Sequence, residues 1–225
     1  MTFSHSHSQL LNKLTDNAVL ATGAVVQDSK GLFSVKGDLI INRPFEGAVF
    51  ARVEGSVRAT NAGLTTLKGF PAFVGGNCLV GANRLTNLDH APLHVGMGFM
   101  VRDNQLTSLV NCPTCDILNA GGNPINNLKG IPDQLIELKI IDCNLESLDG
   151  LQQVERVHLD WQPNLGLLKL LVAKTINLYP GKMEHTETIN QIQPIMDKYA
   201  GQGQKGALAC AAELADAGFK ENAQW

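Results

Sequence analysis

The feature that most constrains this chain is a repeat of about 20 residues in its middle. Four segments share the pattern N-x-L-x-x-L-x-x-x-P, with Ala62 in the Asn position of the first: 62–71, 83–92, 104–113 and 123–132. A fifth copy over 143–152 has Cys143 in the Asn position and no proline. The prolines and the leading apolar residues keep the same period, so a single structural unit recurs along the chain. The leading residues are Leu64, Leu85, Leu106, Ile125 and Leu145.

Two apolar residues alternate before each Asn position, which predicts a short strand with one face turned inward. The pairs are Val57 and Ala59, Cys78 and Val80, Phe99 and Val101, Leu118 and Ala120, and Leu138 and Ile140. The Asn amide is expected to hydrogen bond the backbones of adjacent coils, while Pro and Gly turn the chain back. Because a single coil cannot bury its own apolar face, the array must be stabilised by stacking.

The repeat predicts an α/β repeat fold, a leucine-rich-repeat-like solenoid of short parallel strands with helical caps at the ends. Segments 8–20, 186–200 and 204–218 carry apolar residues at helical spacing. The predicted organisation is an N-terminal helical cap over 1–36, a leucine-rich-repeat-like solenoid over 37–180 and a C-terminal helical cap over 181–225. Fewer than 50 residues follow Pro180, too few for the ubiquitin-ligase domain that often follows the repeats in bacterial leucine-rich-repeat effectors.

Composition narrows the classes of partner. The net charge is −3 and only 17% of residues are charged, so electrostatics give no reason to expect nucleic-acid or membrane binding. No run of 18 apolar residues and no secretory signal is present, and five cysteines form an odd set. Reduced thiols and a cytoplasmic location are therefore expected.

The sequence offers little candidate chemistry. Cys112 and Cys115 form a C-x-x-C pair, but they lie between a repeat proline and the next strand rather than at a helix N-terminus. A zinc site needs further ligands at suitable spacing, and Pro92 excludes a helix that would pair His90 with His94. We therefore expect no catalytic residues, no metal and no cofactor.

The repeats resemble the short, polar leucine-rich-repeat-like proteins of bacteriophage genomes, in which N-x-L-x-x-L-x-G-x-P recurs. The tail over 198–225 also resembles a C-terminal segment of such proteins. The resemblance implies a phage-encoded repeat protein in the host cytoplasm, and it implies no common reaction. Ala62 and Cys143 replace the Asn of this unit, so the coils at the ends of the array are expected to be less regular.

The outward residues of the predicted strands form the candidate partner-binding face, on the concave side of the solenoid. They are Arg58, Leu79, Met100, Arg102, Asn119, Lys139, Ile141, His158 and Asp160. Three of them are apolar and three form a weakly basic flank, and exposed apolar residues ringed by polar ones indicate protein contact.

The predicted function is a non-catalytic protein-binding module that engages a host or phage protein. One alternative is a structural or self-assembling virion-associated component. A less favoured one is a thiol-dependent enzyme at Cys112 and Cys115. The sequence leaves the oligomeric state open.

Overall fold

The computed structural model describes residues 3–225, with side chains from residue 7 onward. The chain divides into two compact units. Unit 1 extends to Leu106 and includes Val110–Asn119, and unit 2 comprises Thr107–Leu109 and Ala120–Trp225. Both units are parts of a parallel β-solenoid. Within residues 3–225 no helix is long and apolar enough to cross a membrane.

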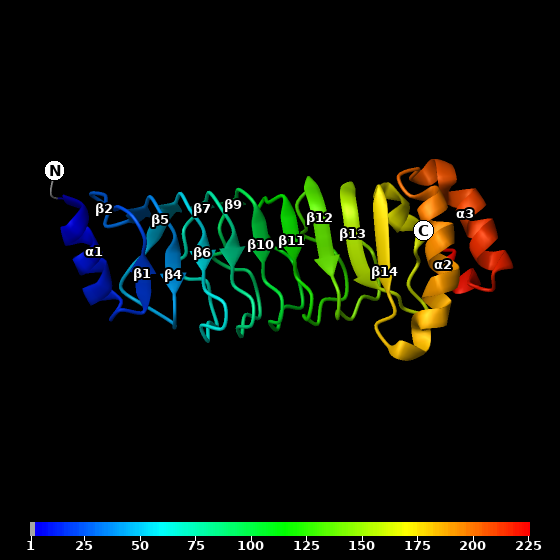
Figure 1. The fold of residues 1–225 in the computed structure, drawn as a ribbon, viewed down its shortest axis with the longest axis horizontal. Coiled ribbons are helices and arrows are strands. Elements are labelled where there is room, and N and C mark those ends of the chain that lie inside the picture. Colours follow the sequence, from blue (N-terminus) through cyan, green and yellow to red (C-terminus); the bar gives the residue numbers. More distant parts are fainter. Residues whose placement is uncertain (1–2) are drawn as a thin grey trace. The chain divides into compact units, whose positions relative to one another are not determined.

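Unit 1 contains helix α1 (Phe3–Leu14) and two sheets, and α1 packs against β1 and β2 (Figure 1). The strands of the first sheet, in spatial order, are β1 (Val19–Ala21), β4 (Leu39–Ile41), β6 (Val57–Arg58), β8 (Cys78–Leu79), β10 (Gly98–Met100) and β11 (Ile117–Asn119). The second sheet contains β2 (Val25–Gln27), β3 (Phe33–Val35), β5 (Phe50–Val53), β7 (Phe73–Val74) and β9 (His94–Val95).

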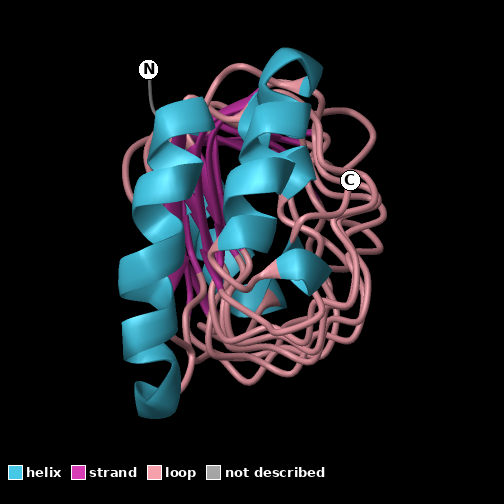
Figure 2. Cartoon of the chain, turned by 90° about the vertical axis from the view of Figure 1, so that its right-hand side faces the viewer, coloured by secondary structure: helices cyan, strands magenta, loops and turns pink. Residues whose placement is uncertain are grey.

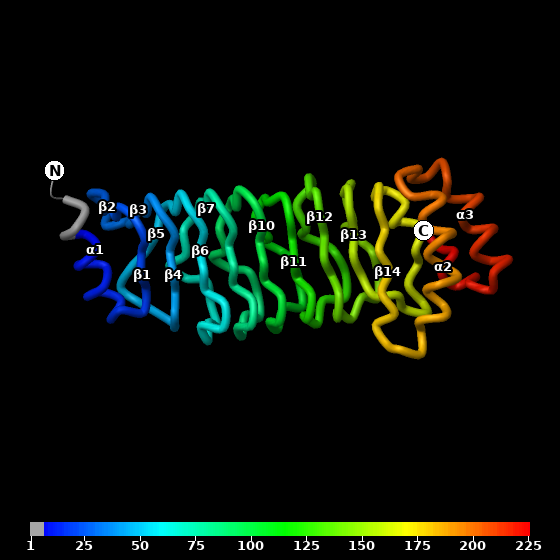
Figure 3. The backbone as a smooth tube through the Cα atoms, viewed as in Figure 1, coloured from blue at the N-terminus to red at the C-terminus, as the bar shows by residue number. Residues whose placement is uncertain are grey.

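From β5 to β10 consecutive strands alternate between the two sheets, so each of these coils gives one strand to each sheet. Figure 3 follows the backbone through these coils. The pairs β1–β4 and β2–β3 are antiparallel, whereas the other pairs in unit 1 are parallel. The repeat pattern thus predicts the strands of the first sheet. The second sheet was not predicted from the repeat and is seen only in the structure.

The helix predicted over 8–20, within the N-terminal cap assigned to 1–36, ends at Leu14 in the structure. Asp16 and Asn17 adopt φ values of 47° and 57°, which end the helix. The predicted helix is therefore wrong over 15–20, and strands β1, β2 and β3 follow before residue 36. The physical reason is that alternating Val, Leu and Phe side chains bury better in strands between glycine turns.

The predicted inward pairs are confirmed as the core. Their exposed fractions range from 0% to 1%, and the leucines that follow each Asn position in units 1 and 2 are buried as well. A fully buried Val, Leu or Phe side chain contributes about 1.5–3 kcal/mol. Stacking therefore stabilises coils that could not fold alone.

The predicted role of the Asn position is also confirmed. Asn83 Oδ1 accepts the amide of Ala62 at 3.0 Å. Its Nδ2 donates to the carbonyl of Ala59 in the preceding coil at 2.8 Å and to Val80 in its own coil at 2.9 Å. Asn104 bonds Val80 in the same way one coil later, at 3.1 Å. Each buried amide thereby ties two successive coils together.

Unit 2 contains three parallel strands, with one short 3-10 helix before the last strand and further helices after it. They are β12 (Leu135–Ile140), β13 (Val154–Asp160), β14 (Thr175–Tyr179), η1 (Leu168–Val172), η2 (Met183–His185), α2 (Thr186–Tyr199), α3 (Gln204–Asp216) and η3 (Lys220–Asn222). The two helices predicted in this part of the chain are found as α2 and α3. Helix α2 packs against β14 and α3, and α3 contacts η1 (Figure 2).

Candidate partner-binding surface

Four of the predicted binding residues form one cross-strand row on the outer face of the first sheet in unit 1. The parallel register pairs Arg58 with Leu79, Leu79 with Met100, and Met100 with Asn119. The row begins two strands earlier, because Leu20 pairs with Ile40 and Ile40 pairs with Arg58. We call this set, Leu20, Ile40, Arg58, Leu79, Met100 and Asn119, the outer row.

The outer row is mainly apolar and only partly covered. Leu20 is 40% exposed, and Ile40, Leu79 and Met100 are half-buried. Side chains at directly opposed positions in adjacent strands contact one another, so Leu20 pairs with Ile40 and Leu79 with Met100. These two apolar pairs form a strip that Arg58 interrupts. Exposed apolar residues that are grouped and ringed by polar ones are typical of protein contact sites.

The basic residues predicted to flank this strip are paired with carboxylates. Arg58 Nε lies 3.4 Å from Asp38 Oδ2, and Arg102 Nε lies 2.7 Å from Asp103 Oδ2. Both arginine side chains are more than half exposed, so each pair contributes little to stability, but each reduces the local positive charge. The predicted weakly basic flank is therefore neutralised in unit 1, and the apolar strip remains its distinguishing property.

In unit 2 the predicted residues Lys139 and His158 are opposed across β12 and β13, and His158 opposes Asn177 of β14. Glu137 lies at the centre of this group. Its carboxylate is 2.8 Å from Lys139 Nζ, 3.3 Å from Arg156 Nη2 and 3.2 Å from His158 Nε2. The face is thus a compact charge network, and Lys139 is neutralised as the two arginines are.

The network has clear electrostatic consequences. The hydrogen bond from Lys139 holds the pKa of Glu137 below its usual range. Burial lowers the pKa of His158, whose Nδ1 lies 3.3 Å from the Tyr179 hydroxyl. His158 is thus favoured in its neutral form between Glu137 and Tyr179, and it is not an exposed cation.

The structure corrects the placement of Asp160. Its side chain is nearly buried, with 9% of the residue exposed, so it does not project as an outward binding residue. Its Oδ2 accepts the amide of Asp142 at 2.6 Å. The turn after β14 covers it. Gly181 in this turn lies so close that a Cβ atom built onto it would be 3.3 Å from the Cβ of Asp160. The remaining predicted residue, Ile141, is half-buried just after β12.

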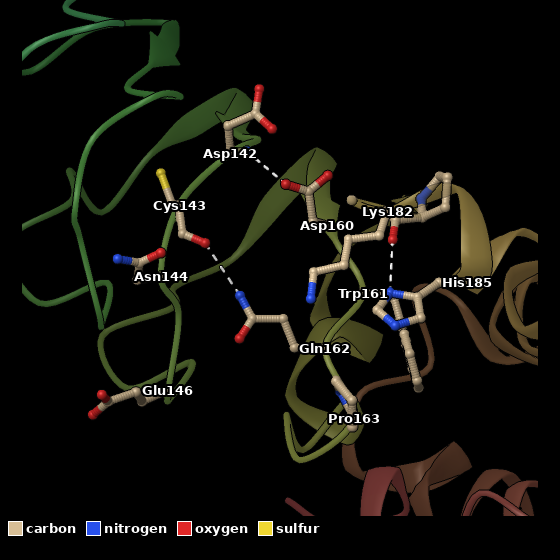
Figure 4. Close-up of a pocket in the computed structure, with 12 residues that line it drawn as sticks. Asp142, Cys143, Asn144, Glu146, Asp160, Trp161, Gln162, Pro163, Lys182 and His185 are labelled. Carbon is tan, nitrogen blue, oxygen red and sulfur yellow. Dashed lines mark hydrogen bonds between the residues drawn. The ribbon is translucent and has the colours of Figure 1, made fainter.

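Asp160 instead borders a pocket of about 610 Å³ within unit 2, which sequence reasoning missed. The segments that follow β12, β13 and β14 supply the lining side chains, as Figure 4 shows. They include Asp142, Cys143, Glu146, Asp160, Trp161, Gln162, Lys182 and His185. These positions lie about 20 residues apart along the repeat, so their polar character after successive strands was the signal that could have found the site.

Cys112 and Cys115 are free thiols in direct contact. A hydrogen bond from Cys112 lowers the pKa of Cys115, and the same bond raises the pKa of Cys112. Cys115 is buried, whereas Cys112 is partly exposed beside a hollow of about 570 Å³. The pair is therefore polarised, with the more acidic thiol on the inside.

Across the described part of the chain, no group of three or more His, Cys, Asp and Glu side chains is arranged to hold a metal ion. Comparisons with protein-family models, with curated proteins and with solved structures found no match.

Proposed function

We propose that this protein is a non-catalytic binding module that engages a host or phage protein through the outer row of unit 1. The observation that carries the proposal is the outer row, in which two apolar pairs flank Arg58 and are left partly exposed on the outer face of a sheet. The pairs are Leu20 with Ile40 and Leu79 with Met100. Central apolar anchors with a polar rim supply most of the affinity in protein interfaces.

The neutralised charges support an apolar contact. Arg58 and Arg102 are already paired with Asp38 and Asp103, so they set the polar rim and leave no free positive patch for an acidic partner. Charged pairs at a rim affect the rate and specificity of association more than the affinity.

Affinity capture from infected bacterial cells tests the proposal. The tagged chain and its Met100→Glu and Leu79→Glu variants are compared with Val26→Glu. Val26 is a matched control because it is 48% exposed on β2 of the other sheet of unit 1. We expect the two outer-row variants to lose the captured protein by about tenfold or more, since a buried charge in an interface core costs several kcal/mol.

Equal capture by Met100→Glu and Val26→Glu would refute the assignment of this face. Light scattering distinguishes the binding module from the alternative, a structural or self-assembling component. A large homo-oligomer that forms from the pure chain and dissociates in Met100→Glu would make the outer row a self-assembly surface instead.

We also propose that the coils are leucine-rich-repeat-like, that the helices at both ends act as caps, and that the protein belongs with the bacteriophage repeat proteins it resembles. The recurring Asn83 and Asn104 ladder and the packing of α1 and α2 against terminal strands support this reading. Such a protein would act in the host cytoplasm, without cofactor, nucleic acid or membrane. Localising a tagged copy during infection tests that placement.

A further inference from the structure

The pocket of unit 2 is formed by the carboxyl ends of three parallel strands. Asp142 and Cys143 follow β12, Trp161 and Gln162 follow Asp160 at the end of β13, and Lys182 follows β14. Parallel strands bring such ends to one edge, which is where ligands bind in many parallel sheets. The volume of about 610 Å³ lies within the usual range for small-molecule and side-chain sites.

The carboxylates of this pocket have no cation of their own. Among residues 3–225, no ion pair joins Asp142, Glu146 or Asp160 to a Lys, Arg or His side chain. The lysine of the pocket, Lys182, has its Nζ 3.9 Å from Glu184, outside the pocket. The lining therefore carries three carboxylates and one lysine, with no ion pair between them.

Among these carboxylates, Asp160 has the greatest need of a compensating charge, because the residue is nine-tenths buried. One oxygen accepts the amide of Asp142, and Figure 4 shows the carboxylate beside that residue at the pocket. Burial raises the pKa of Asp160, which reflects how poorly its charge is compensated. Buried charges in folded proteins are normally paired, so this one lacks a partner that a ligand can supply.

A second group in the wall is also left unsatisfied. The Trp161 indole Nε1 is buried with no hydrogen-bond partner among the described residues, and Trp161 as a whole is 8% exposed. Its ring contacts His185 edge-on at 4.9 Å, and His185 Nδ1 donates to the carbonyl of Pro180 at 3.0 Å. Buried donors are nearly always satisfied. An ammonium or guanidinium group has no acceptor of its own, so this N–H would be satisfied only by a ligand that also carries an oxygen acceptor, such as the backbone carbonyl of a Lys or Arg residue.

The thiol and the amide in the pocket are already engaged. Burial raises the pKa of Cys143 to about 11, so this side chain is a neutral thiol at physiological pH. Gln162 Nε2 donates to the carbonyl of Cys143 at 3.1 Å. Neither group competes for the charge of Asp160, and the recognition chemistry of the pocket rests on its carboxylates.

We propose that this pocket binds an ammonium or guanidinium group, with the Asp160 carboxylate as its ion-pair partner and Asp142 as a second acidic contact. The group belongs either to a free amine or guanidine or to a Lys or Arg side chain of a protein. The inference is independent of the outer row, which lies in unit 1.

Fluorescence titration of the full chain tests the site. The protein has two tryptophans, so Trp225→Phe leaves Trp161 in the pocket wall as the only reporter. The probes are agmatine, N-acetyl-lysine amide and a heptapeptide with a central arginine, with N-acetyl-glutamine amide as the neutral control. We expect a saturable change with the cationic probes and none with the neutral one.

Variants separate the site from general charge effects. Asp160→Asn is expected to weaken binding by about tenfold or more, in line with the loss of a charged hydrogen bond. Asp142→Asn should weaken it less, and its exposed side chain makes a folding defect improbable. The matched control is Asp103→Asn in unit 1, because Asp103 and Asp142 occupy the same left-handed turn position, with φ values of 55° and 57°.

Each outcome decides the proposal. Binding of agmatine supports a free cation, and binding of the peptide alone supports a side chain of a partner protein. The proposal is overturned if no cationic probe gives a saturable change, if the neutral probe binds equally, or if Asp160→Asn binds as Asp103→Asn does. Circular dichroism checks the folding of Asp160→Asn, and should it not fold, the comparison of Asp142→Asn with Asp103→Asn decides.

Discussion

Gln193 of α2 hydrogen bonds the backbone of β14 with both ends of its side-chain amide. The amide of Leu178 donates to Gln193 Oε1 at 2.9 Å, and Gln193 Nε2 donates to the carbonyl of Ile176 at 2.6 Å. The side chain thus takes the place of a neighbouring strand at an edge of unit 2. Unpaired strand edges promote association with other chains, so α2 protects this edge by specific bonds as well as by apolar packing.

Replacing Gln193 by Ala should therefore destabilise unit 2. We expect a loss of about 1–3 kcal/mol in the free energy of unfolding, because two backbone groups lose their partners. Urea denaturation measures the loss, and light scattering should detect increased association through the open edge. Gln191→Ala is the control, since Gln191 is exposed and its Nε2 donates to Glu187 Oε1 at 3.5 Å on the helix surface. Equal stabilities of the two variants would contradict this role for Gln193.

The asparagine ladder gives a second prediction. Asn83→Ala removes the hydrogen bonds of one buried amide to Ala62, Ala59 and Val80. The expected cost is about 2–4 kcal/mol, since several buried backbone groups are left unsatisfied. Thermal and urea unfolding measure it. The exposed Asn87, which accepts a bond from the amide of Asp89 at 3.0 Å, provides the milder Asn87→Ala control. A loss no larger than that of the control would show that the ladder does not stabilise the coils.

The charge network of unit 2 predicts a pH-dependent contribution from Glu137. Its folded-state pKa is lowered, so its stabilising effect is fully present above the unfolded pKa of about 4.3 and is lost as pH falls through the folded value. The stability difference between the unmodified chain and Glu137→Gln should thus be largest near neutral pH and shrink in acid. Urea unfolding across this pH range measures the difference.

Glu54→Gln serves as the control for Glu137→Gln, because Glu54 is exposed and lies in unit 1. Its replacement should change the free energy of unfolding by only about 0.5 kcal/mol or less, because it is an exposed surface position. A Glu137→Gln difference that grows as pH falls would have the wrong sign and would refute the account of the network.

The polarised thiol pair predicts a single early titration step. Absorbance at the thiolate band should rise below the usual cysteine range, because a hydrogen bond from Cys112 lowers the pKa of Cys115. Burial raises the pKa values of Cys78, Cys143 and Cys210, so these thiols do not contribute to that step.

Cys112→Ala should move the step to higher pH by removing the donor, whereas Cys210→Ala should leave it in place. Absence of an early step in the unmodified chain would remove the physical basis for thiol-dependent chemistry at this pair. Its presence would justify testing the chain with disulfide substrates.

Residue patterns predicted the coils of the solenoid well for specific reasons. The inward positions, such as Phe99 and Val101, follow from strict alternation, and the role of Asn83 follows from a polar residue recurring at a buried position. The outer row also follows from the repeat, because equal coil lengths place Leu79 and Met100 in register. These features depend on local periodicity alone.

Other features depended on contacts that periodicity does not contain. Arg58 and Arg102 looked like free positive charges, but their rotamers reach nearby carboxylates. Asp160 occupies an outward position by alternation, yet the turn at Gly181 covers it. The second sheet of unit 1 arises from short segments whose alternation spans only two or three residues, too few for a clear signal.

By itself the sequence determined that this chain stacks as repeating coils, since each coil has an apolar face that only its neighbours can bury. Tertiary structure alone decided which charges are neutralised, where Asp160 is buried and that Asp142, Trp161 and Lys182 meet around one pocket. The physical reason is that burial follows a short-range pattern of residues, whereas ion pairs and pockets depend on the positions of side chains that are distant in the chain.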